Sequence, residues 1–229
     1  YLKLAWEIIK EGIYAIRRDS TRERVAEDCW RMLHGCERLG ADVELGGLQY
    51  LRDLESAPVI VANHMSSLET IVMPAILVPF FPPVFIIKSS LGRYPLLGRI
   101  FRQIGMIEVE RKSARDDLKA VMTQGTACLQ KGVAVMLFPQ SSRVYDFNPA
   151  DFNTLGTRLA RKAKAPLVPL ALQPDFWRCG KLIKDVGRID PTRPVRFEFG
   201  PPVVDVHNVH EANQQAATFI DERLRVWRA

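Results

Sequence analysis

The sequence predicts a layered α/β protein with a mostly parallel central sheet flanked by helices, preceded by a two-helix N-terminal extension. After Pro58, strand-like and helix-like segments alternate along the chain. Apolar runs such as 133–138 are continuous, which is typical of strands buried on both faces. The chain has 229 residues, 47% of them hydrophobic and 25% charged, so it can bury a large core without a metal or a disulfide.

The first 40 residues predict two amphipathic helices, over 2–18 and 21–39, because apolar residues recur there at helical spacing. We assign 1–40 to a helical extension and 41–229 to the α/β domain. The apolar faces of the two helices either pack against the core or lie in a membrane interface. Trp6 would suit an interface.

The α/β region predicts six strands and five helices. Strands are expected at 58–62, 84–88, 106–109, 133–138, 166–172 and 194–199, and helices at 66–80, 92–103, 113–131, 152–163 and 208–227. The longest apolar run, 71–87, contains four prolines and is a poor membrane span. We interpret it as a buried helix, a proline turn and a buried strand. The alternative is an apolar face that dips into a bilayer.

The net charge of +6 and the pI of about 9.3 suit an anionic partner, such as a phosphorylated ligand or an anionic membrane face. Lysines and arginines are scattered without interleaved aromatic residues, so we do not expect nucleic-acid binding. The four cysteines form no Cys-x-x-Cys pair and no zinc-site spacing, and no secretory signal is visible. We therefore expect reduced thiols, a cytosolic environment and no metal.

His64 and Glu69 directly follow the apolar run 58–62. On a regular helix, side chains five residues apart point about 140° away from each other. The two can meet only if His64 lies in a strand-to-helix turn and Glu69 lies in the first helical turn. Ser66-x-x-Glu69 matches a capping box, which predicts a helix start there. Glu69 either only caps this helix, or it orients an imidazole that removes a proton from a hydroxyl.

Three cations stand at the ends of separate predicted strands: Lys88, Arg111 and Arg143. In an open α/β sheet, ligands bind beyond the carboxyl ends of the strands. Guanidinium groups there can hold a phosphate through charge-assisted hydrogen bonds. Each cation taken singly is better explained as a solvated surface residue, whereas three cations at the same end of separate strands favour an anion site.

Four short sequence blocks, in this order along the chain, resemble the motifs of a known family. They are Asn63 to Glu69, the short apolar strand 105–111 that ends in arginine, Phe138 to Arg143, and the Val-Pro-rich strand 166–172. From about residue 37 to about residue 202, the chain resembles glycerolipid acyltransferases of the 1-acylglycerol-3-phosphate acyltransferase type. That family carries Asn-His-x4-Asp in the first block and Phe-Pro-Glu-Gly-Thr-Arg in the third.

The chain departs from this pattern at three positions. Glu69 replaces the aspartate, Gln140 replaces the glutamate of the third block, and Ser141 replaces its glycine, whereas Ser142 keeps the threonine hydroxyl. By resemblance, the third block and Asn63 belong to the acceptor site. The departures therefore bear on the identity of the acyl acceptor more than on the type of reaction.

The resemblance implies transfer of a fatty acyl group from acyl-CoA or acyl carrier protein to a hydroxyl of a lysophospholipid, with lysophosphatidic acid as the first expected acceptor. His64 is the expected general base and Glu69 its orienting partner, while Arg111, Arg143 and Lys88 are expected to hold the phosphate. No cofactor is implied beyond the thioester co-substrate. The expected partners are the two substrates, acyl carrier protein and the cytoplasmic face of a membrane, on which the protein would be peripheral.

Three alternatives stay open. The acceptor can be an aminolipid or a glycolipid, or the chain can be a catalytically silent lipid-binding protein of the same fold. A hydrolase is the third, although the Gly-x-Ser-x-Gly elbow of serine hydrolases is absent from the sequence.

Overall fold

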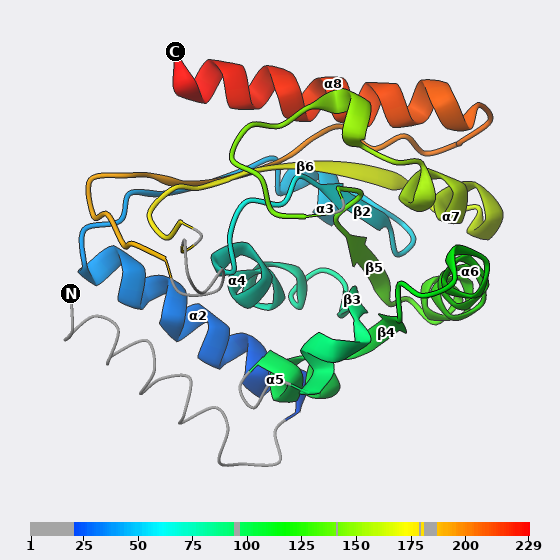
Figure 1. Ribbon diagram of the computed structural model, residues 1–229, viewed down its shortest axis with the longest axis horizontal. Coiled ribbons are helices and arrows are strands. Elements are labelled where there is room, and N and C mark those ends of the chain that lie inside the picture. The colour runs from blue at the N-terminus through cyan, green and yellow to red at the C-terminus, as the bar shows by residue number, and fades with distance from the viewer. Residues whose placement is uncertain (1–20, 94–96, 141, 179, 181–186) are drawn as a thin grey trace.

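The computed structural model describes residues 21–229 except for 94–96, 141, 179 and 181–186. Within these residues, seven strands form one sheet in the order β1-β7-β6-β2-β5-β3-β4 (Figure 1). All neighbours in it are parallel except β6 and β7. The strands are β1 (Val43–Gly46), β2 (Val59–Ala62), β3 (Pro83–Lys88), β4 (Met106–Val109), β5 (Ala134–Leu137), β6 (Leu167–Pro174) and β7 (Val195–Phe199).

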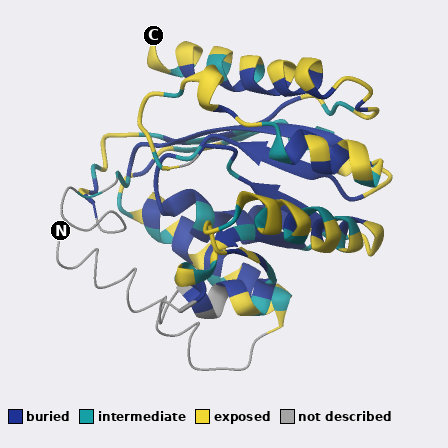
Figure 2. Ribbon diagram, turned by 45° about the vertical axis from the view of Figure 1, so that its right-hand side comes forward, coloured by how far each residue is buried: buried dark blue, intermediate teal, exposed yellow. Residues whose placement is uncertain are grey.

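Helices cover both faces of the sheet. On one face lie α2 (Arg22–Arg38), α4 (Leu68–Leu77) and α5 (Leu97–Ile104), and on the other α6 (Ala114–Gln130), α7 (Leu155–Ala163) and α8 (Val209–Arg228). Strand β2 shows why both layers are needed. Its side chains alternate between two apolar clusters, with Ile60 in the α2–α4 cluster and Val61 in the α6–α7–α8 cluster. Figure 2 shows the strands buried between helices whose outer surfaces are exposed.

This architecture confirms the predicted fold class, and the six predicted strands occur with ends within two residues of those expected. Two elements were not predicted from the sequence: β1, a four-residue edge strand ending in glycine, and the short helix α3 (Gln49–Arg52). The predicted helix 92–103 begins later, at Leu97, after the 3₁₀ turn η1 (Ser89–Arg93). A second 3₁₀ turn, η2 (Pro149–Asp151), precedes α7. The predicted helix 2–18 lies outside the described residues.

The apolar run 71–87 is part of the core, as interpreted from its prolines. It comprises most of α4, a turn, and most of β3, and almost all of the α4 side chains are buried. Helix α2 packs its apolar face against α4 in the same cluster, burying Val25, Cys29, Met32, Leu33 and Cys36. Among the described helices, none is both long and apolar enough to cross a bilayer.

The topology places three loops beside one another at the centre of the sheet. Strand β2 lies between β5 and β6, and all three run parallel. Their carboxyl ends therefore share one edge of the sheet, where open α/β proteins bind ligands. The loops that follow them begin at Asn63, Phe138 and Asp175.

Candidate active site

Glu69 lies in the first turn of α4, with 0% of its surface exposed. Its Oε1 accepts hydrogen bonds from His64 Nδ1 at 2.8 Å, from Met65 N at 2.7 Å and from Ser66 N at 2.9 Å. Its Oε2 accepts from Ser66 N and from Ser66 Oγ, both at 2.9 Å. The carboxylate therefore closes the start of the helix and orients the imidazole at the same time, because the turn brings both sets of donors to it.

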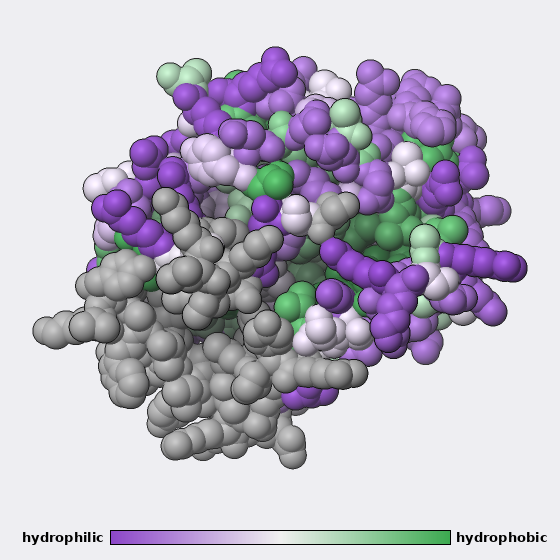
Figure 3. Space-filling view, viewed as in Figure 1, coloured by the Kyte–Doolittle hydropathy of each residue, from purple (hydrophilic) through white to green (hydrophobic). Residues whose placement is uncertain are grey.

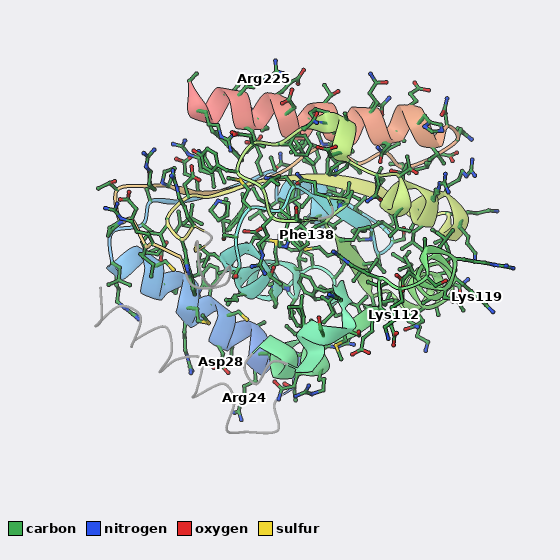
Figure 4. All side chains as sticks on the ribbon, in the orientation of Figure 1. Arg24, Asp28, Lys112, Lys119, Phe138 and Arg225 are labelled. Carbon is green, nitrogen blue, oxygen red and sulfur yellow. The ribbon has the colours of Figure 1, made fainter. Side chains whose placement is uncertain are left out.

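The His64 ring is held on two further sides. It stacks on Phe138 with the ring centroids 4.1 Å apart and the planes 16° from parallel. Arg143 Nε donates to His64 Nε2 at 3.3 Å. Since Nδ1 faces a carboxylate, the proton of the neutral ring belongs on Nδ1 and the lone pair on Nε2. Figure 4 labels Phe138 near the centre of the molecule. An imidazole in this state can accept a proton at Nε2.

The third block fixes the backbone of His64. Gln140 Oε1 accepts from His64 N at 2.8 Å, and Val144 N donates to His64 O at 3.0 Å. Gln140 is 5% exposed, and its amide oxygen accepts as a carboxylate oxygen would. The observed contact of Gln140 is therefore to the loop 63–67 between β2 and α4, called the histidine loop below. Ser142 is exposed, and Ser141 lies outside the described residues.

Asn63 joins the ends of two strands. Its Nδ2 donates to Leu172 O and its Oδ1 accepts from Leu172 N, both at 2.8 Å. Asn63 is 1% exposed, so this pair of bonds is buried between β2 and β6. The structure therefore places Asn63 where it holds the histidine loop against β6.

The three predicted cations all lie at the carboxyl edge of the sheet, but at different distances from the histidine. Arg143 touches His64. Lys88 ends β3, two strands away from β2, and Arg111 follows β4, three strands away. At about 4.8 Å per strand, these two backbones lie roughly 10 and 14 Å along the edge from β2.

Arg111 adopts a backbone conformation that is uncommon for a residue with a side chain, with φ of 59°. The Asp117 carboxylate holds it there by accepting from Glu110 N at 2.9 Å and from Arg111 N at 2.8 Å. The chain therefore turns sharply at the end of β4, and the start of α6 fixes this turn.

A cavity of about 230 Å³ opens beside the histidine loop. It is lined by Met65, Ser66 and Arg143 from the predicted motifs, and by Tyr145, Asp175 and Arg178 among others. The last three were not predicted as site residues from the sequence. One signal was present: Asp175 directly follows the apolar strand 166–172 and its short continuation, as His64 follows β2.

Comparison with known proteins agrees with this fold. A family model described as Acyltransferase matches residues 42–173, which is more than half of the chain. The chain belongs to this acyltransferase family.

Its relatives include the 1-acyl-sn-glycerol-3-phosphate acyltransferase of Pseudomonas aeruginosa, which is 29% identical over 191 residues covering 79% of this chain and 70% of the relative. A probable enzyme of the same name from Mycoplasma pneumoniae is 30% identical over 52% of this chain and 45% of the relative. The crystal structure of the Thermotoga maritima 1-acyl-sn-glycerophosphate (LPA) acyltransferase, PlsC, has a TM-score of 0.70 at 16% identity and covers 95% of this chain and 86% of that one. It shares the fold.

Proposed function

We propose that this protein transfers a fatty acyl group from acyl-CoA or acyl carrier protein to a hydroxyl of a lysophospholipid, with lysophosphatidic acid as the first acceptor to test. The observation that carries the proposal is the imidazole of His64, held by Glu69 at Nδ1 and with Nε2 facing Arg143, a residue of the cavity wall. The curated relatives named above act on 1-acyl-sn-glycerol 3-phosphate by name. The family model matches residues 42–173, which include this pair.

In the proposed reaction, the acceptor oxygen attacks the thioester carbonyl carbon while its proton moves to His64 Nε2. The Glu69 carboxylate stabilises the imidazolium that forms, as the acid of a catalytic triad does. The tetrahedral intermediate then collapses, the carbon–sulfur bond breaks, and the leaving thiolate takes the proton. A positioned base of this kind contributes about 10²- to 10⁴-fold in rate.

In the free protein, Arg143 blocks the atom of His64 that would act as the base. Its Nε occupies the lone pair of His64 Nε2 at 3.3 Å, which is where the acceptor hydroxyl must donate. A phosphate offers a guanidinium a stronger, charge-assisted partner than a neutral imidazole does. We therefore expect the acceptor phosphate to draw Arg143 away and free the base. Lys88 and Arg111 would extend the same positive edge toward a longer phosphate-bearing substrate such as coenzyme A.

The surface supports a lipid substrate. Figure 3 shows an apolar area right of centre, beside the region where Figure 4 labels Phe138, framed by hydrophilic side chains. Val144 and Tyr145, which line the cavity, are 38% and 43% exposed. An aromatic ring with a polar tip suits the membrane–water boundary. We propose that the protein works as a peripheral protein on the cytoplasmic face of a membrane, with the opening of the cavity toward the lipid.

The silent lipid-binding alternative receives less support. This alternative is motivated by the replacement of family residues at Glu69, Gln140 and Ser141, of which Ser141 lies outside the described residues. Glu69 reaches His64 Nδ1 at 2.8 Å, and Gln140 reaches His64 N at 2.8 Å. Both replacements therefore leave an oriented imidazole.

The test supplies purified protein with lysophosphatidic acid and labelled acyl-CoA or acyl carrier protein and measures labelled diacyl product. His64→Ala is expected to lower turnover by at least about 10²-fold with an unchanged melting profile. His207→Ala is the matched control, because the His207 side chain is 86% exposed and pairs only with Asp205 in the described structure. Equal turnover for His64→Ala and the parent protein would exclude His64 as the base. Liposome binding without turnover by the parent protein would instead support a lipid-binding protein.

A further inference from the structure

A buried carboxylate that the proposed mechanism does not use lies in the wall of the cavity. Asp175 follows β6 and is 2% exposed. Its Oδ2 accepts from Gln173 Nε2 at 3.0 Å. Its Oδ1 is buried and has no hydrogen-bond partner in the described part of the chain. Since buried polar atoms in proteins are nearly always paired, this oxygen points to a group that binds there.

The neighbouring cation is also incompletely paired. Arg178 Nε lies 4.0 Å from Asp175 Oδ1, which is too far for a hydrogen bond, and the Nε atom is buried without a hydrogen-bond partner among the described residues. The guanidinium of Arg178 lies over the Tyr145 ring, 4.9 Å from its centroid, and Arg228 of α8 lies 4.5 Å from the same centroid. The aromatic ring therefore holds Arg178 at the cavity.

Among the described residues, three buried atoms of this cluster lack a hydrogen-bond partner: Gln173 Oε1, Asp175 Oδ1 and Arg178 Nε. The last two together define what fits between them. Asp175 Oδ1 can only accept a hydrogen bond, whereas Arg178 Nε can only donate one. A hydroxyl oxygen can lie about 2.8–3.0 Å from both atoms when they are 4.0 Å apart, donating to the first and accepting from the second. An ammonium group lacks the acceptor that Nε needs. A fully ionised phosphate lacks the donor that Oδ1 needs and is repelled by the carboxylate.

We propose that Asp175 and Arg178 form a head-group subsite that binds a hydroxyl of the acyl acceptor other than the hydroxyl that is acylated. The subsite shares its cavity with Arg143, so one head group can place its anionic group on Arg143 and a hydroxyl on this pair. The acceptor class is then a lysolipid with a polyol head group. This inference rests on the proposed acyl transfer, since it names the substrate of that same site.

The experiment compares three acceptors of equal acyl chain: lysophosphatidylglycerol, lysophosphatidylethanolamine and lysophosphatidic acid. The parent protein is expected to have its highest kcat/KM with lysophosphatidylglycerol. Asp175→Ala is expected to lower that value by about 10- to 100-fold, as loss of a hydrogen bond to a charged group does, while changing the value for lysophosphatidic acid by less than about 3-fold. Asp190→Ala is the control, because Asp190 lies in the same β6–β7 connection but is absent from the cavity wall.

The outcomes separate the subsite from the proposed function. An equal loss on all three acceptors, or an effect on lysophosphatidylethanolamine as large as on lysophosphatidylglycerol, would overturn the hydroxyl subsite while acyl transfer stands. If the parent protein acylates none of them, calorimetry with glycerophosphoglycerol and glycerol 3-phosphate decides. Binding of the first that is lost in Asp175→Ala supports the subsite, and binding unaffected by that change, or no binding, means that ordered water alone fills the gap.

Discussion

Replacing Glu69 by glutamine isolates the negative charge from the hydrogen bonds that Glu69 accepts. An amide keeps one acceptor oxygen, and the Oε1 position receives His64 Nδ1, Met65 N and Ser66 N. The amide nitrogen then takes the Oε2 position, where Ser66 Oγ can rotate to accept from it. The second contact of Ser66 N is lost, but the first, at 2.9 Å, remains. We expect Glu69→Gln to cost only about 1–2 kcal/mol of folding stability.

The rate is expected to fall much further than the stability. A neutral amide cannot stabilise the imidazolium that forms when His64 takes a proton, and related changes in catalytic triads cost about 10⁴-fold in kcat. We expect a loss of about 10²- to 10⁴-fold in kcat for Glu69→Gln, measured with labelled acyl donor at saturating acceptor. The melting temperature of the same sample, measured by circular dichroism, gives the stability.

Glu69→Ala is the companion variant. It leaves the buried N–H groups of Met65 and Ser66 without this acceptor, at about 1–3 kcal/mol each, so it should lose about 2–6 kcal/mol of folding stability as well as activity. A kcat for Glu69→Gln within a few-fold of the parent value would refute the reasoning, because the charge would then play no part in the rate. An equal loss of stability in both variants would show that the accepted hydrogen bonds were wrongly assigned.

Packing and thiol chemistry give two more predictions. Gly156→Ala should lower stability by about 2–3 kcal/mol and the melting temperature by roughly 4–12 °C, because a Cβ there would lie 2.4 Å from Val61 Cγ1 where α7 crosses β2. Burial raises the pKa of the Cys29 and Cys36 thiols to about 12, so both stay protonated at pH 8. Burial also raises the pKa of the Cys128 thiol, but Cys128 is only partly buried. Cys29 and Cys36 should therefore react with iodoacetamide far more slowly than Cys128. Peptide mapping of the alkylated protein reports the order.

Each of these two predictions has its control. Gly35→Ala adds the same atom to helix α2, where the far end of Arg38 is the only group of the described residues within 4 Å apart from the helix's own backbone, and should leave stability unchanged or raise it by up to about 1 kcal/mol. A melting temperature for Gly156→Ala equal to that of the parent would contradict the tight contact between α7 and β2. Alkylation after unfolding should make the cysteines equivalent. Cys29 or Cys36 reacting first in the folded protein would contradict their burial.

Local patterns were enough to predict most elements. The six predicted strands and the helices between them follow from residue type and period. Strands β2 and β5 and most of β6 are continuous apolar runs, because both of their faces are buried. Strand β1 could not be predicted from local patterns. Its four residues are half-buried, and it is a strand only because β7 lies beside it. The antiparallel pairing of β6 with β7 is likewise a property of the assembled sheet.

The contacts of the site also fall into two groups, those between residues close in the sequence and those between distant segments. His64 and Glu69 are five residues apart, so a turn and a helix start suffice to join them, and the capping pattern predicted both. Gln140 is 76 residues from His64, and Asn63 is 109 from Leu172. Contacts between segments so far apart depend on which strands are neighbours.

The sequence by itself determined a parallel α/β fold, an imidazole–carboxylate pair and cations at the ends of strands, because each depends on residues close together in the chain. Only the tertiary structure decided that β2 lies between β5 and β6. That order brings Arg143 to His64 and sets Lys88 and Arg111 apart. It also places Asp175 and Arg178 at the same cavity. The physical reason is that strand neighbours are chosen by burial of the whole sheet, which no single segment encodes.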